Sequence, residues 1–359
     1  MNFYDNIVNL DIENSSICNA ACPQCLRETY PGDYSWFKQT YLTLDFFDSI
    51  PDKVYCNIQK ILFSGTMGDP CAAPNFIEVV KKVRTKAPNV MIKISTNGGM
   101  KNSEFWIALA EALGPNHEVN FAIDGLQDTN HIYRMNVNYK KVMSNSQAFI
   151  NAGGVANWQF IVFKHNQHQV TEVKQLSKQL GFANLIIIPS HRFGLDVILG
   201  RRPVGANGVV IEPPTDEKFV HSVVMQPLKK LQVQEWLDSS ESSHIDCYAK
   251  KDRSVYIDSQ GNLFPCCFLA ASLYSRATLT VPDGWDHLWD TEGKSKVNLY
   301  QTEWDDIIDN IFYNKIQESW DGRKYNEGRL AVCAGNCGTF EGRFNDPNQF
   351  DNIMKKANE

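Results

Sequence analysis

Three cysteines near the start of the sequence are spaced closely enough to bind one metal centre. Directly after an apolar stretch comes the run Cys18-Asn19-Ala20-Ala21-Cys22-Pro23-Gln24-Cys25. Three neighbouring thiolates can hold three corners of an iron–sulfur cube, and the fourth iron then stays open to a small molecule. Zinc and buried structural thiols are the alternatives, but zinc usually takes four ligands, and neither a second cysteine pair nor a histidine accompanies this run.

A second set of cysteines occupies the last third of the sequence. Cys247 precedes a predicted hairpin, and Cys266 ends that hairpin. The pair Cys333 and Cys337 follows after a long gap. Four thiolates can close a second [4Fe–4S] cluster or bind a structural zinc ion. We assign Cys266 as the ligand from its spacing, and its neighbour Cys267 remains a spare thiol.

The elements that position these residues follow a regular alternation in the first half of the chain. Strands are predicted at Ile7–Ile12, Lys60–Ser64, Val90–Ser95, Glu118–Ile123, Ala156–Phe163 and Asn184–Ile188. Helices are predicted near Leu44–Ile50, Pro74–Ala87, Ser103–Leu113, Tyr139–Ala152 and His168–Leu180. Strands that alternate with helices of this length form βαβ units and a parallel sheet. The sequence therefore predicts an α/β fold.

Polar residues follow several of the predicted strands, and ligands bind at the carboxyl ends of parallel strands. The candidates are Gly68 and Asp69 after the second strand, Ser95 and Asn97 at the end of the third, Asp124 after the fourth with Arg134 downstream, and His191 and Arg192 after the sixth. Ordinary turns, a helix N-cap and a surface ion pair are the structural alternatives for most of them. His191 and Arg192 are candidates for substrate contact.

The cysteine spacing and the turn Gly65-Thr66-Met67-Gly68-Asp69-Pro70 resemble motifs of the radical S-adenosylmethionine (SAM) superfamily. Gln24 departs from that pattern, because an aromatic residue often stands there. The resemblance implies a partial (β/α)6 TIM-like barrel and a [4Fe–4S] cluster on Cys18, Cys22 and Cys25 whose open iron binds SAM. It also implies that Gly68, Asp69, Ser95, Asn97, Asp124 and Arg134 contact SAM, with Asp124 alternatively contacting the substrate.

The C-terminal cysteines resemble the SPASM/twitch extension of this superfamily, in the form with a single auxiliary [4Fe–4S] cluster. The resemblance divides the chain into a barrel core at 1–190, a connector or lid at 191–246, and a small cysteine-rich α+β extension at 247–359.

The activity implied by this resemblance is reductive cleavage of SAM to a 5′-deoxyadenosyl radical, which abstracts a substrate hydrogen. The auxiliary cluster would then accept an electron, as in an anaerobic oxidoreductase or modifying enzyme. The expected partners are a peptide or small polar metabolite as substrate and an electron donor of the flavodoxin or ferredoxin type. A redox-neutral epimerase or rearrangement enzyme is the first alternative, and a non-catalytic metal-binding scaffold is the second.

The composition is that of a globular protein. Of 359 residues, 43% are hydrophobic and 21% are charged, and the net charge is −6. No strong basic stripe is present, so we expect no nucleic-acid partner. The start of the sequence lacks a signal-peptide pattern, and no apolar run is long enough to span a membrane. We therefore expect a cytoplasmic protein, in which ten cysteines favour metal binding over disulfides.

Overall fold

In the computed structural model the chain forms two compact units. The structure describes residues 6–29, 38–189, 193, 208–220, 241–274, 294–309, 315–321 and 324–339. The first unit comprises Met1–Ile17, Tyr30–Ile92 and Glu235–Glu341, and the second comprises Cys18–Thr29, Lys93–Gln234 and Gly342–Glu359. The division at 1–190, 191–246 and 247–359 follows the order of the chain, and its boundaries stay a prediction.

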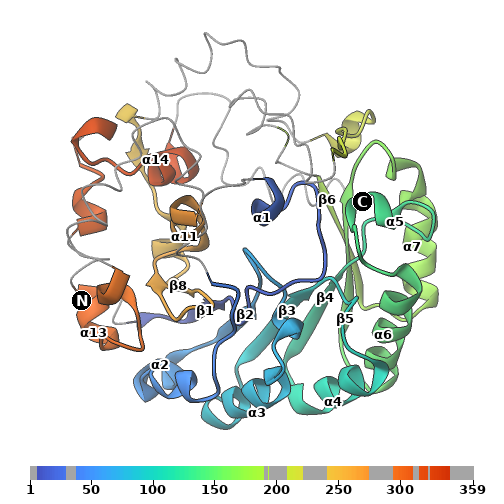
Figure 1. Cartoon of the computed structure of the whole chain (residues 1–359), viewed down its shortest axis with the longest axis horizontal. Coiled ribbons are helices and arrows are strands. Elements are labelled where there is room, and N and C mark those ends of the chain that lie inside the picture. Colours follow the sequence, from blue (N-terminus) through green and yellow to red (C-terminus); the bar gives the residue numbers. More distant parts are fainter. Residues whose placement is uncertain are drawn as a thin grey trace. The chain divides into compact units, whose positions relative to one another are not determined.

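The first unit is built around the strand β1 (Asn9–Ile12) (Figure 1). This strand pairs in parallel with β2 (Lys60–Phe63) on one side and with β8 (Ser254–Ile257) on the other. β8 then turns into the short antiparallel strand β9 (Leu263–Phe264), so the expected hairpin is confirmed. Leu10 and Ile12 are almost fully buried, whereas Asn9 and Asp11 are half-buried and alternate with them on the opposite face of the sheet.

The remaining elements of the first unit are short, apart from one helix of eleven residues. They are η2 (Asp45–Asp48), α2 (Asp52–Asn57), η3 (Pro70–Ala72), α3 (Phe76–Lys86), β7 (His244–Ile245), α10 (Tyr248–Lys251), α11 (Cys267–Tyr274), η7 (Lys294–Val297), α13 (Trp304–Ile307), η9 (Tyr325–Glu327), α14 (Ala331–Cys337) and β10 (Gly338–Thr339). β7 and β10 form an antiparallel pair of their own. The C-terminal elements that the structure describes are therefore small, and of these α10 and β9 contact β8.

The second unit contains the later strands of the alternating region. β3 (Met91–Thr96) begins in the first unit and continues into the second. It is followed by β4 (His117–Ala122), β5 (Ala156–Val162) and β6 (Asn184–Pro189), which are neighbours in that order. β4, β5 and β6 pair in parallel. The strands therefore all end at the same edge of the sheet.

Helices cover one face of these strands, as Figure 1 shows for α4 (Ser103–Leu113), α6 (Tyr139–Asn151) and α7 (Val170–Gln179). The other helices of the unit are α1 (Leu26–Thr29), α5 (Asn130–Tyr133), η4 (Gln167–Gln169) and η5 (Glu217–Phe219). The covered face is aromatic, because Trp106 packs against Phe121 at 5.0 Å and Trp158 packs against Phe182 at 5.2 Å between ring centroids. Such large buried rings contribute much of the apolar area that holds the helices on the sheet.

The predicted fold class is confirmed as a mostly parallel α/β arrangement, and in neither unit does the sheet close into a ring within the described residues. All six predicted strands are present, with shifts of a residue or two at their ends. The predicted helix Leu44–Ile50 is instead the short 3-10 helix η2, because Pro51 disfavours helical geometry at Ile50 and is the N-cap of a separate helix, α2. The sequence of Gln226–Leu237 also predicts a helix, and this segment lies outside the described residues. None of the helices described is long and apolar enough to cross a lipid bilayer.

Candidate functional site

The three N-terminal cysteines lie on one loop of the second unit, before α1. Backbone bonds fix this loop: Cys25 N donates to Cys22 O at 2.8 Å, and Ala21 N donates to Met135 O at 3.1 Å. The guanidinium of Arg27 also donates to the carbonyl of Ala20. Cys22 is buried and the other two thiols are half-buried. The loop therefore holds its thiols in place and partly shields them from water.

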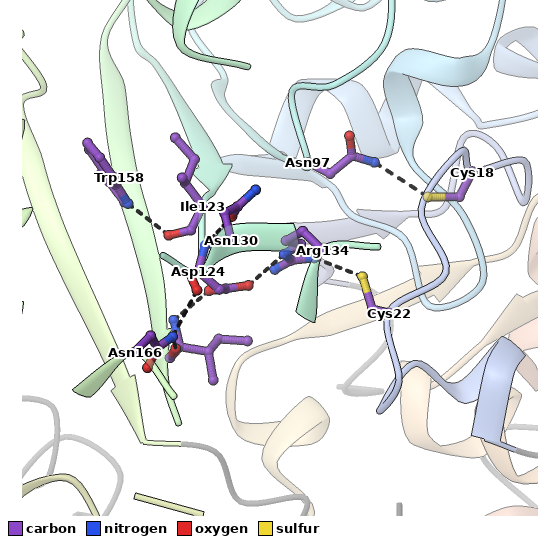
Figure 2. A network of polar contacts seen from close by, with 10 residues as sticks. Cys18, Cys22, Asn97, Ile123, Asp124, Asn130, Arg134, Trp158 and Asn166 are labelled. Carbon is purple, nitrogen blue, oxygen red and sulfur yellow. Dashed lines mark hydrogen bonds and ion pairs between the residues drawn. The ribbon is translucent and has the colours of Figure 1, made fainter. Parts of the chain in front are cut away.

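Polar side chains of the second unit approach two of these sulfur atoms (Figure 2). The Nδ2 atom of Asn97 lies 3.5 Å from Cys18 Sγ, and Nη1 of Arg134 lies 3.6 Å from Cys22 Sγ. Burial raises the pKa of Cys22, while the positive charge of Arg134 acts in the opposite direction. Donors placed in this way stabilise negative charge on sulfur, which a metal-bound thiolate carries.

A second guanidinium adds positive charge near the cysteine loop. Burial alone would lower the pKa of Arg27, but the sulfur atoms of Cys18 and Cys25 and the carboxylate of Glu28 raise it above its ordinary value. Arg27 also forms a 3.0 Å ion pair with Glu28. All three cysteines thus have a cation or an amide donor nearby.

Asp124 holds Arg134 in this position (Figure 2). Its Oδ2 accepts from Arg134 Nε at 2.6 Å, and its Oδ1 accepts from the backbone N–H of Ile161 at 2.6 Å. The Asp124 side chain is fully buried and Arg134 is 14% exposed. Burial would lower the pKa of Arg134, but the charges of Asp124 and Cys22 raise it well above its ordinary value, so the guanidinium stays charged.

The ends of β4 and β5 are tied together around Asp124 by amide side chains. Asn130 Oδ1 accepts from the Asp124 N–H at 2.9 Å. Asn166 Nδ2 donates to the Asp124 carbonyl at 2.8 Å, and the indole of Trp158 donates to the Ile123 carbonyl at 2.9 Å. Both oxygens of the Asp124 carboxylate and its backbone groups therefore already have partners within the second unit. This arrangement suits a positioning residue rather than a direct ligand contact.

In the first unit, the turn that contains Gly68 and Asp69 is tight. A Cβ atom on Gly68 would lie 2.1 Å from the Ser15 carbonyl oxygen, so only glycine fits there. Asp69 donates its N–H to Ile17 O at 2.9 Å, and its side chain accepts from the Cys71 N–H at 3.0 Å. The Asp69 carboxylate therefore caps η3.

The four cysteines of the second set line one small apolar pocket in the first unit. Cys247 precedes α10 and Cys266 precedes α11, while Cys333 and Cys337 lie one turn apart on α14. Aromatic and aliphatic side chains complete the lining, among them Trp320 and Leu269. Cys267 does not line this pocket, and its Sγ instead lies 3.9 Å from the Tyr248 hydroxyl.

The thiols of this pocket influence one another's protonation. A hydrogen bond from the Cys337 thiol lowers the pKa of Cys247 to about 7. Burial, together with neighbouring sulfur charges, raises the pKa of Cys333 to about 12 and that of Cys266 well above its ordinary value. A bound metal would remove these protons, because thiolates are the ligand form.

No three or more His, Cys, Asp or Glu side chains in the described part of the chain converge closely enough to hold a single ion. A cluster takes its thiolates at separate iron atoms, so its ligands do not need to meet at one point. Three thiols with nearby donors, and four thiols in an apolar pocket, are donor sets that suit iron–sulfur clusters.

The other candidates from the sequence are placed as follows. Ser95 is half-buried in β3, and His191 and Arg192 lie outside the described residues. Sequence reasoning missed Glu13 and Tyr256, which are buried in the first unit and hydrogen-bonded to each other. The sequence did contain a sign of Glu13, because Asp11 and Glu13 are two carboxylates, two residues apart, at the end of an otherwise apolar strand.

Comparison with models of protein families gives one match. Residues 12–174 match the family described as the Radical SAM superfamily. The match begins at the end of β1 and ends within α7. A search of curated proteins finds no match.

Solved structures with bound AdoMet share the fold. The chain is similar to anSMEcpe with bound AdoMet, with a TM-score of 0.54 and 14% identity over 98% of this chain and 92% of the other. It is similar to anSMEcpe with AdoMet and the Cp18Cys peptide, with a TM-score of 0.52 and 15% identity over 98% and 95%. SuiB of Streptococcus suis bound to S-adenosylmethionine gives a TM-score of 0.49 and 13% identity over 93% and 73%.

Proposed function

We propose that this protein is a radical SAM enzyme that oxidises a peptide or a small polar metabolite. The observation that carries the proposal is the cysteine loop of Figure 2, in which Asn97 and Arg134 direct N–H groups at the sulfur atoms of Cys18 and Cys22. Cys18, Cys22 and Cys25 would hold a [4Fe–4S] cluster, which together with SAM would supply a 5′-deoxyadenosyl radical for hydrogen abstraction.

The residues of the chain have distinct roles in this proposal. Gly68 and Asp69 offer backbone groups to the amino end of SAM, while Ser95 and Asn97 serve its ribose or carboxylate. Arg134 has further N–H groups beyond those that contact Asp124 and Cys22, and a guanidinium matches a carboxylate well. Asp124 keeps that guanidinium charged and oriented.

The second cysteine set is proposed to hold an auxiliary [4Fe–4S] cluster in an extension of the SPASM/twitch type. Cys247, Cys266, Cys333 and Cys337 are the ligands, and the shared pocket that excludes Cys267 supports this choice. An electron acceptor at this site makes net oxidation of the substrate possible. A cytosolic electron donor of the flavodoxin or ferredoxin type completes the cycle.

The test is anaerobic reconstitution of three proteins, followed by iron and sulfide analysis. The wild type is expected to hold about eight iron atoms, and replacement of Cys18, Cys22 and Cys25 by alanine should leave about four. Alanine at the four C-terminal cysteines should also leave about four, with 5′-deoxyadenosine still formed from SAM. An unchanged iron content in the variant without Cys18, Cys22 and Cys25 would overturn the proposal. Zinc at the four C-terminal cysteines would rule out the auxiliary cluster as electron acceptor, and with it the proposed oxidation of the substrate.

A redox-neutral reaction is the second candidate, because Cys267 does not line the pocket of the four proposed ligands. It lines a second pocket of the first unit together with Asp11 and Tyr256, and Cys266 lines both pockets. A thiol in such a pocket can return a hydrogen atom to a substrate radical, and the thiyl radical that this leaves would take an electron from the proposed electron donor and a proton from solvent. Incorporation of solvent deuterium into product, lost in Cys267→Ala, would support this candidate over oxidation.

A further inference from the structure

The turn Gly65–Pro70, which is proposed to bind SAM, is hydrogen-bonded to a buried carboxyl group that has no role in the proposed chemistry. Glu13 follows β1 and its side chain is fully buried. Its Oε1 accepts from the backbone N–H of Met67 at 2.5 Å and from that of Gly68 at 3.0 Å. These two amides lie at the centre of the turn Gly65–Pro70. One oxygen atom of Glu13 thus fixes the direction of two consecutive peptide groups.

The second oxygen of Glu13 connects the same turn to the C-terminal part of the chain. The Tyr256 hydroxyl, on β8, lies 2.8 Å from Glu13 Oε2 and 3.1 Å from Thr66 Oγ1. A tyrosine hydroxyl has one proton and can donate only one bond. A protonated Glu13 that donates to Tyr256 would let Tyr256 donate to Thr66, and burial raises the pKa of Glu13 to about 8. The three side chains form one continuous chain of hydrogen bonds.

The backbone around this network has little freedom to compensate. A Cβ on Gly65 would lie 1.7 Å from the Gly68 carbonyl oxygen, and one on Gly68 would meet the backbone of Ser15 and Ser16. The N–H of Glu13 itself donates to the Ile257 carbonyl at 2.8 Å. The turn therefore packs directly on the segment after β1, and Glu13 supplies the buried acceptor for its inward N–H groups.

We infer that Glu13, with Tyr256, is a positioning residue that shapes the Gly65–Pro70 turn for SAM. Without the carboxyl group, two buried N–H groups would lose their acceptor, and a buried donor without a partner is costly. The peptide groups that carry the N–H groups of Met67 and Gly68 would then rotate toward other hydrogen-bond acceptors. The backbone groups of the turn that face away from Glu13 would move with them. This inference rests on the proposed function, because it takes the turn as part of the SAM site.

The experiment measures the hydrogen exchange of the turn and the affinity for SAM separately. Hydrogen exchange of the peptide spanning 64–70 is recorded without SAM, and the Kd for SAM is measured by equilibrium dialysis on the anaerobically reconstituted protein. Glu13→Ala should raise exchange and weaken SAM binding, each about ten-fold, which corresponds to about 1.4 kcal/mol. The kcat at saturating SAM should change less than about two-fold, since a positioning residue acts through binding.

Conservative variants and a matched control separate positioning from simple destabilisation. Glu13→Gln keeps an oxygen for both N–H groups and should restore most of the SAM affinity. Tyr256→Phe should weaken binding about three-fold and add little to Glu13→Ala, because both act through one network. The control is Asp258→Asn, since Asp258 is also fully buried but accepts from Gln260 and Asn262 of its own turn.

Each outcome decides the inference. Unchanged exchange of 64–70 in Glu13→Ala would overturn it, as would an equal loss of SAM affinity in Asp258→Asn. If the wild type holds its cluster but does not bind SAM, the proposed function fails together with the inference. If the wild type binds SAM and Glu13→Ala binds it equally well, only the inference fails.

Discussion

The ion pair between Asp124 and Arg134 offers the sharpest test of the site in Figure 2. We predict that Asp124→Asn destabilises the protein by about 3 kcal/mol, in the range for breaking a buried pair. The carboxylate is fully buried and accepts from both Arg134 and Ile161. An asparagine can still accept from Ile161, but its amide N–H groups would face the guanidinium, which would remain buried without a counter-charge.

The assay is thermal unfolding of the protein without its cluster, monitored by circular dichroism. A loss of about 3 kcal/mol should lower Tm by about 6 °C, since each kcal/mol shifts Tm by roughly 2 °C in chains of this size. The matched control is Glu212→Gln, which removes a 2.9 Å ion pair with Lys164 in the same unit. Those side chains are 59% and 48% exposed, so the expected loss is below about 0.5 kcal/mol.

The same variant also tests the link to the cysteine loop. With Asp124 replaced, Arg134 should no longer be held against Cys22, so the spectrum of the reconstituted cluster should change. Glu212→Gln should leave that spectrum as in the wild type. Equal Tm values for the two variants, or an unchanged cluster spectrum in Asp124→Asn, would refute the reasoning that the pair positions a donor to sulfur.

Three further predictions concern other parts of the two units. Burial raises the pKa of Asp11 from 3.8 to about 6, so its contribution to the free energy of unfolding is present below pH 4 and is lost as the pH rises through 6. Asp11→Asn should therefore stabilise the protein by about 1–3 kcal/mol at pH 7 and by much less at pH 4. Urea titrations at both pH values measure this difference. Gly68→Ala should abolish 5′-deoxyadenosine formation while iron content is kept, because the added Cβ would lie 2.1 Å from the Ser15 carbonyl oxygen. Gly153→Ala should lose only stability, because Gly153 has φ +88° and a Cβ there would have no atom within 4 Å. Asn97→Ala should make the cluster proposed on Cys18, Cys22 and Cys25 harder to reduce, because an N–H group near sulfur stabilises the reduced state. A redox titration monitored by electron paramagnetic resonance checks this, and an unchanged potential would contradict it.

Local pattern was enough to predict the strands and most of the longer helices. The parallel strands are short, apolar and bounded by turn residues, and Gly114, Gly153 and Gly181 follow three of the helices with positive φ. These features depend on a few neighbouring residues, so a single sequence contains them. The cysteine sets were also visible, because thiol spacing along the chain limits what chemistry is possible.

Long-range pairing was not predictable in the same way. The hairpin of β8 and β9 was expected, but its parallel pairing with β1 was not, since no local pattern specifies a partner so distant in sequence. The roles of Asn130 and Asn166 around Asp124 also escaped prediction. An amide beside a strand end looks like any turn residue until the fold brings its partner within hydrogen-bond distance.

The pairing of β1 with β8 has a consequence for how the chain is made. Tyr256 stands 243 residues after the Glu13 that it contacts. At roughly 5–20 residues per second, a ribosome needs on the order of 10–50 s to add that length. During this interval β1 has one edge without its native neighbour, and exposed strand edges favour aggregation. We expect newly synthesised chains to depend on chaperones at this stage, and the cluster proposed at the second cysteine set to be loaded only after Cys337 has been added.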